Sequence, residues 1–83
     1  MQHAILCNGP VFRFERWGSG LSYELTHKPS GTSVFCQGDD AARIDTDFLA
    51  AEAAFPDKTT EQLAAWLWDQ CEYGMVATPV AGA

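Results

Sequence analysis

The segment LSYELTH, residues 21–27, alternates large side chains with polar ones without a break. The first set comprises Leu21, Tyr23, Leu25 and His27, and the second comprises Ser22, Glu24 and Thr26. This strict period of two is typical of a half-buried β-strand, whereas a helix would scatter each set around its axis. The chain is therefore expected to build a sheet with one buried face.

Turn signals on both sides of this segment predict a three-stranded β-meander over about residues 11–37. Upstream, the aromatic segment VFRFERW (11–17) is joined to it by GSG (18–20), and glycine permits the positive φ angles that tight hairpins need. Downstream, the turn at 28–31 has proline in its second position and glycine in its fourth, before TSVFCQ (32–37).

The register can also be predicted, because a slip of one residue would turn every side chain to the wrong face. A first turn centred on Ser19-Gly20 sets Phe14 against Leu25 and Phe12 against His27. A second turn closed by His27 and Thr32 sets Leu25 against Val34 and Tyr23 against Cys36. The predicted buried face comprises Phe12, Phe14, Leu21, Tyr23, Leu25, Val34 and Cys36. The opposite face is polar, except for Trp17 and Phe35.

Beyond Gly38 the apolar residues recur every three or four positions, which predicts a helix over about residues 40–55. Its apolar stripe comprises Ala41, Ile44, Phe48, Ala51 and Phe55. Asp39 is the predicted N-cap, since an aspartate can accept a hydrogen bond from a free N–H of the first turn. Pro56 ends the helix.

A second helix is predicted over about residues 60–73, opened by a capping box from Thr59 to Gln62 and ended by Gly74. Leu63, Trp66 and Leu67 share its apolar arc, whereas Trp68 lies at the border of the polar face. The link at 56–58 is short, so the two helices are expected to form an antiparallel hairpin.

These elements predict one α+β domain over residues 1–83. An antiparallel three-stranded β-meander packs against a C-terminal antiparallel helical hairpin. The tail, residues 75–83, is expected to be loosely held or disordered toward its end, and a fourth strand at the edge of the sheet is the alternative. Apolar residues make up 47% of the chain, which is typical of a folded domain rather than a disordered one.

The formal charge of -6 is concentrated in one half of the chain. Residues 39–72 hold nine acids against Arg43 and Lys58, a net charge of 2 - 9 = -7, whereas residues 1–38 carry +1. An acidic face repels phosphate groups, so direct nucleic-acid binding is not expected, and a basic protein is the better partner. The alternative is that the acids are only a solvated surface.

The three cysteines, Cys7, Cys36 and Cys71, show neither metal-ligand spacing nor a disulfide framework, and their odd number suits a reducing compartment. The first residues lack the basic and apolar regions of a secretory leader, and no stretch approaches 18 apolar residues. The sequence therefore predicts a cytoplasmic protein without contact to a membrane, with no metal and no cofactor.

Catalytic residues are not expected either. On the predicted ladder Cys36 and His27 lie four residues apart, about 13 Å, too far for a thiol and its base. Asp39-Asp40 is better explained by helix capping, and Asp45 and Asp47 point in opposite directions on a helix.

Exposed aromatic and acidic residues therefore define the candidate binding surface, since aromatic side chains dominate interface hot spots. The predicted partner-binding residues are Trp68, Asp69, Glu72, Glu61, Asp45, Asp47, Trp17 and Phe35. Two alternatives remain for Trp17 and Phe35: the N-terminal or C-terminal segment covers them, or they lie in a homodimer interface. A different alternative concerns the whole chain: it is a small ligand-binding or enzymatic domain that uses Tyr23, His27 or Cys36 in a cleft between sheet and helices.

In size, acidity and strand-strand-strand-helix-helix layout, residues 11–74 resemble the small phage or mobile-element inhibitors of host defence, such as anti-CRISPR and anti-restriction proteins. The resemblance rests on layout and includes no diagnostic motif, so no functional residue is carried over. It implies a non-enzymatic inhibitor that occludes a nucleic-acid-binding protein partner.

Overall fold

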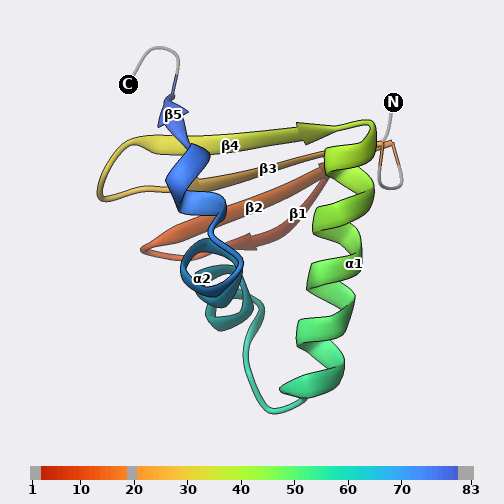
Figure 1. The fold of residues 1–83 in the computed structure, drawn as a ribbon. Helices are drawn as coiled ribbons and strands as arrows, with labels where there is room; N and C mark the ends of the chain where they lie inside the picture. The colour runs from red at the N-terminus through yellow and green to blue at the C-terminus, as the bar shows by residue number, and fades with distance from the viewer. Residues whose placement is uncertain (1–2, 19–20, 81–83) are drawn as a thin grey trace.

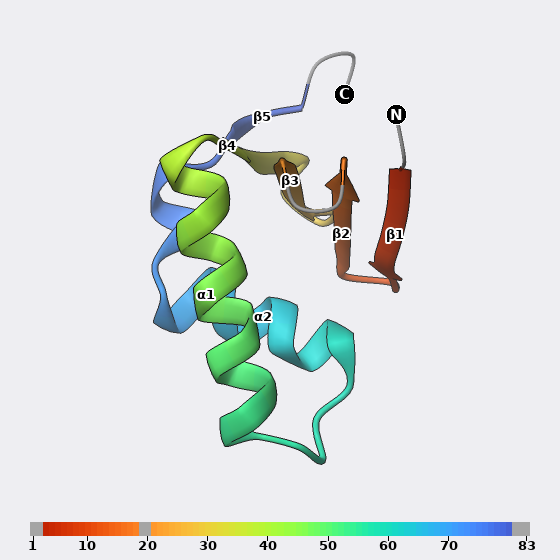
Figure 2. The same cartoon turned by 90° about the vertical axis from the view of Figure 1, so that its right-hand side faces the viewer.

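A computed structural model describes residues 3–18 and 21–80 and shows an α+β fold in which two helices lie on one face of an antiparallel sheet (Figures 1 and 2). The strands are β1 (His3–Asn8), β2 (Phe12–Trp17), β3 (Ser22–His27), β4 (Thr32–Gln37) and β5 (Thr78–Pro79), side by side in chain order. The helices are α1 (Asp39–Ala54), α2 (Thr60–Gln70) and the short 3-10 helix η1 (Tyr73–Val76). The predicted α+β class is therefore confirmed, with five strands in place of three or four.

The predicted register of the three central strands is confirmed. Phe14 lies opposite Leu25 and Phe12 opposite His27, and the next pairs are Leu25 with Val34 and Tyr23 with Cys36. The proposed turn centre, residues 19 and 20, lies outside the described part of the chain. Leu21 is 67% exposed, contrary to prediction, because β3 begins only at Ser22.

The two additional strands lie at the edges of the sheet. β1 pairs with β2, and β5 pairs with Thr32 and Ser33 of β4. The described parts of both termini thus widen the sheet, and they do not fold over its second face. Figure 2 shows both helices on one side of the sheet and the other side without a helix.

The helix termini agree with the prediction only in part. The capping box of α2 is confirmed, with Gln62 N–H donating to Thr59 Oγ1 at 3.2 Å. Asp39 is not the N-cap of α1, because Gly38, with a φ of 61°, takes that position and the helix begins at Asp39 itself. α2 ends at Gln70, three residues before the predicted end at Tyr73. The left-handed conformation of Glu72, with a φ of 65°, redirects the chain there and starts η1.

The helices cross instead of forming the predicted antiparallel hairpin. Figure 1 shows α1 from the side and α2 nearly along its axis. α2 packs against β1 and β2, whereas α1 packs against β3 and β4. The crossing follows from this division, because each helix must bury its apolar side against a different half of a twisted sheet.

The core lies between the sheet and the two helices. Its largest fully buried side chains are Phe14, Tyr23, Leu25, Cys36, Ile44 and Leu67. Trp66 and Trp68 both pack partly buried against this core. Trp66 contacts Phe55 near the link between the helices, with ring centroids 5.7 Å apart, and Trp68 contacts the sheet.

Candidate functional site

The thiol groups lie in environments that favour the protonated form. Burial raises the pKa of Cys36 to about 11, and burial also raises the pKa of Cys7 and Cys71 above the ordinary value. Because the thiolate is the reactive form, none of the three is activated as a nucleophile near neutral pH. His27 stacks on Trp68 and its Nδ1 lies 2.7 Å from Ser30 Oγ, so it is directed away from Cys36.

Residues 3–18 and 21–80 contain no group of three or more His, Cys, Asp or Glu side chains arranged to hold a metal ion. Within the same ranges, no helix has the length and apolar character needed to cross a membrane.

Three of the acids predicted to bind a partner have internal hydrogen-bond partners. Asp45 accepts a hydrogen bond from the Tyr23 hydroxyl group, and Asp47 accepts one from the Tyr73 hydroxyl group at 2.7 Å. Glu61 accepts hydrogen bonds from the backbone N–H groups of Val11 and Phe12, at 2.9 and 3.0 Å. Asp69 and Glu72, by contrast, are exposed.

Glu61 fastens the turn between β1 and β2 to the start of α2. The two backbone N–H donors at Phe12 and Val11 hold the pKa of Glu61 below its ordinary value of 4.5. Gly9 is required beside it, because a Cβ atom there would lie 2.0 Å from Glu61 Oε2. This contact joins residues 50 positions apart in the chain.

Glu61→Gln is expected to remove an acid-dependent part of the stability. Because the pKa of Glu61 is lower in the folded chain, its contribution is present above pH 4.5 and is lost as the pH falls through the folded value. We expect the difference in Tm between wild type and variant to shrink from pH 7 to pH 3, as measured by circular dichroism. A constant difference over that range would contradict this role. Gly9→Ala, which displaces the same carboxylate, should show the same trend.

Trp68, the predicted anchor for a partner, points toward the sheet. Its ring centroid lies 5.8 Å from that of Phe12 and 5.4 Å from that of His27, on which it stacks. Gly74 lies directly against the ring, since a Cβ atom there would be 2.5 Å from Trp68 Nε1. These contacts are those of a structural residue, and partner binding by Trp68 stays a prediction.

Trp17 and Phe35 meet on the helix-free face, which is defined here as the side of the sheet opposite α1 and α2. Their ring centroids are 6.1 Å apart, and His3 stacks on Trp17 at 4.8 Å. Phe35 is 52% exposed, and Ile5 of β1 is 50% exposed. The register puts Ile5 opposite Glu15, and thus on the same face. Apolar and aromatic side chains from three strands therefore gather on one surface.

Several polar side chains of the helix-free face are paired with one another. Glu15, only 7% exposed, lies 2.8 Å from His3 Nε2, and Glu15 Oε1 lies 2.9 Å from Arg13 Nε. Glu24 accepts a hydrogen bond from Ser33 at 3.0 Å. Arg13 and Glu15 form an ion pair, so a partner could cover these two side chains without removing an isolated charge from water.

His3 and Ile5 were not identified from the sequence as binding residues. The segment HAILCN has no regular alternation, and so its strand was not predicted. A signal was present nevertheless, because Asn8-Gly9 before the aromatic segment is a dipeptide typical of hairpin turns.

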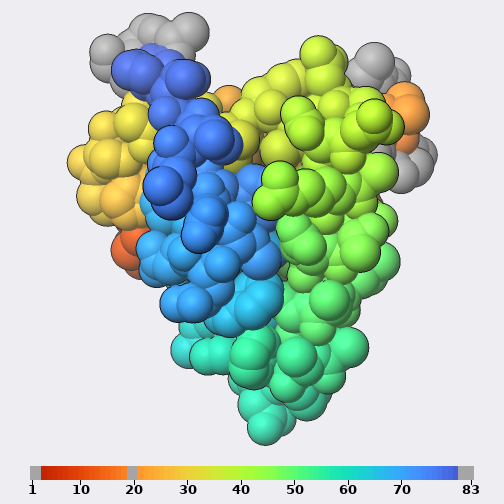
Figure 3. Space-filling model, in the orientation of Figure 1, coloured from red at the N-terminus to blue at the C-terminus, as the bar shows by residue number. Residues whose placement is uncertain are grey.

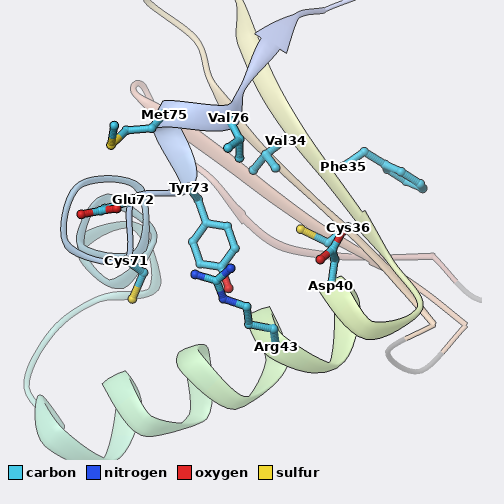
Figure 4. Close-up of a pocket in the computed structure, with 10 residues that line it drawn as sticks. All are labelled: Val34, Phe35, Cys36, Asp40, Arg43, Cys71, Glu72, Tyr73, Met75 and Val76. Carbon is cyan, nitrogen blue, oxygen red and sulfur yellow. The ribbon is translucent and has the colours of Figure 1, made fainter.

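A second feature is a hollow of about 510 Å³ along the outer edge of β4. Its lining includes Val34, Phe35, Cys36, Arg43, Tyr73 and Met75. Figure 3 shows it as a notch between η1 and the first turns of α1, and in Figure 4 the Arg43 and Tyr73 side chains meet inside it. The Arg43 guanidinium lies 5.3 Å from the centre of the Tyr73 ring. This hollow is called the β4 groove below.

The sequence matches no protein-family model, no curated protein and no solved structure. The geometry of this chain is therefore the main basis for its proposed function.

Proposed function

We propose that this chain is a non-enzymatic protein-binding module that docks through the helix-free face of its sheet. The observation that carries the proposal is the exposure of Ile5 and Phe35, at 50% and 52%, beside the half-buried ring of Trp17. In the part of the chain that the structure describes, helices cover only the other face (Figure 2). Large apolar side chains that a partner buries supply most of the energy of an interface, and aromatic ones are enriched at hot spots.

The charge of the chain supports a basic partner. Asp39, Asp40, Glu52, Asp57, Asp69 and Glu72 are exposed, in contrast to the internally bonded Asp45, Asp47 and Glu61. Exposed acids raise the association rate with a positively charged protein. Occlusion of a nucleic-acid-binding protein, as in the phage inhibitors that the layout resembles, is the form of this proposal that uses both the apolar face and the acids.

A matched pair of substitutions tests the docking surface. Phe35→Ser removes a 52% exposed side chain from the helix-free face, whereas Leu49→Ser removes a 56% exposed side chain from α1. The partner is first captured from an extract of the source cells with the wild-type chain as bait, and it is then purified. We expect Phe35→Ser to raise the Kd for this partner at least tenfold, roughly 1.4 kcal/mol, and Leu49→Ser to change it less than twofold. Equal affinities for both variants would contradict the proposal.

Two controls identify the kind of partner. Light scattering of the purified chain shows whether the partner is a second copy, because Phe35→Ser would then convert a dimer into a monomer. Association rates measured at two salt concentrations test the acidic contribution, since steering by exposed charges weakens as salt is added.

A further inference from the structure

We infer that the β4 groove binds an extended segment of a partner protein, which adds a strand to the outer edge of β4 and places a lysine or arginine side chain in the groove. This site lies at the edge of the sheet and thus goes beyond docking through the helix-free face.

The first observation is an unpaired half of β4. β5 pairs only with Thr32 and Ser33, and the chain before Thr78 leaves the edge to form η1. Among the described residues, no strand pairs with the outer side of β4 between Val34 and Gln37. An open edge of this kind is the template on which extended peptides add as strands.

The backbone groups that face this edge can be assigned from the ladder. The backbone groups of successive residues point alternately to the two sides of a strand. Because the N–H of Lys28, directly after β3, donates to Val11 O, every second residue counted back from Lys28 directs its backbone groups toward β2. The residues between them, which include Tyr23 and Leu25, face β4 and pair with Cys36 and Val34. The N–H and C=O groups of Phe35 and Gln37 therefore point outward and are available to a new strand.

The β4 groove lies beside these outward groups. Three consecutive residues of β4, Val34 to Cys36, line it, and since consecutive side chains point to opposite faces, the hollow follows the edge of the strand. Figure 4 shows the Phe35 ring turned away from the other lining side chains. Alternate residues of an added strand would therefore enter the groove, and those between them would lie on the side of Phe35.

The charges and apolar surfaces of the groove suit a long basic side chain. Arg43 is matched by Asp47, with Nε 3.9 Å from Oδ2, and is stacked over Tyr73. Asp40 and Glu72 are the two carboxylates that line the groove, and both are exposed. The aliphatic part of a lysine or arginine can lie against apolar walls while its charge approaches carboxylates at the rim.

The test titrates an acetylated peptide of sequence Thr-Val-Thr-Lys-Thr-Val-Thr into the ¹⁵N-labelled chain and follows the amide signals of the chain by NMR. We expect the amide signals of Phe35 and Gln37 to shift, with a Kd below about 1 mM. A peptide with glutamate in place of lysine should bind at least threefold more weakly. Shifts confined to β1 or to the helix-free face, or no binding at 1 mM, would overturn the inference.

Backbone methylation provides the sharper control. If the peptide adds antiparallel to β4, as β5 does, and its lysine occupies the groove, the two flanking threonines lie on the side of Phe35 and exchange hydrogen bonds with β4, whereas the N–H groups of the valines point away. N-methylation of those two threonines should abolish the amide shifts, and N-methylation of the two valines should preserve them. Equal effects of both modifications would exclude strand addition.

Chain variants separate this inference from the proposed function. Asp40→Asn should weaken binding of the lysine peptide roughly two- to fivefold, as expected for an exposed charge pair. Asp57→Asn removes the same charge outside the groove and should leave the affinity unchanged. Equal affinities of these two variants would overturn the lysine assignment. Ile5→Ser changes the helix-free face at β1, at the edge of the sheet opposite to the β4 groove, so peptide binding should remain within threefold of wild type in a variant that has lost docking through the helix-free face.

Discussion

Trp68→Ala is expected to lower the melting temperature by roughly 10 °C or more. The indole packs against Phe12, His27 and Gly74, and it joins α2 to the sheet and to η1. Truncation of a fully buried aromatic side chain costs about 3–5 kcal/mol, and Trp68 is half-buried, so a loss of about 2–3 kcal/mol is expected. For a domain of this size, each kcal/mol corresponds to about 4–8 °C.

Trp17→Ala is the matched control, because it removes the same side chain from the helix-free face. Its ring is also half-buried, but it stacks on His3, which is the first described residue, and it lies outside the core. We expect a loss of about 1 kcal/mol in the free energy of unfolding. Thermal and urea unfolding measured by circular dichroism compare the two variants. If Trp68→Ala has the same melting temperature as the wild type, the ring is dispensable for the fold, and its predicted role in partner binding becomes the stronger interpretation.

Tyr73→Ala is expected to have a comparable or larger effect, about 3–5 kcal/mol, because the ring is 5% exposed and η1 is attached to the core through it. Tyr73→Phe retains the ring and removes only the hydrogen bond to Asp47, so its cost should be about 1 kcal/mol. The pair of variants separates packing from hydrogen bonding. A large loss in Tyr73→Phe would show that the hydroxyl group, and not the ring, holds η1 in place.

The pH dependence of the same pair provides a second measurement. Burial, followed by the hydrogen bond and charge of Asp47, raises the pKa of Tyr73 well above its ordinary value of 10. A raised pKa contributes stability that is complete below pH 10 and declines as the pH rises further. The wild-type chain should therefore lose stability above pH 10 more steeply than Tyr73→Phe. Parallel curves would show that ionisation of Tyr73 is not linked to folding.

Much of the sheet could be predicted because its determinants are local. The alternation around Tyr23 and Leu25, together with the sequence signals for turns at 18–20 and 28–31, was sufficient to predict the register of β2, β3 and β4. The capping box at Thr59 is equally local, since its two partners lie three residues apart. β1 was missed because its apolar run has no period, and β5 was expected only as an alternative because two residues are too few to form a pattern.

The candidate site was harder to predict, because the same residue type serves different purposes in different places. Trp17 and Trp68 are both half-buried, but one lies on the helix-free face and the other between α2 and the sheet. No periodicity distinguishes a carboxylate that holds a buried hydroxyl group, as Asp47 does, from an exposed one such as Asp69.

The sequence by itself determined the buried side of each central strand, the register between them, the capped start of α2 and the concentration of acidic residues in the second half. Only the tertiary structure decided that Glu61 holds the turn at Val11, that Asp47 holds Tyr73, and that no described strand pairs with the outer edge of β4 beyond Ser33. The physical reason is distance along the chain. Secondary structure depends on residues two to four positions apart, whereas these contacts join residues 26 and 50 positions apart and exist only once the core has brought them together.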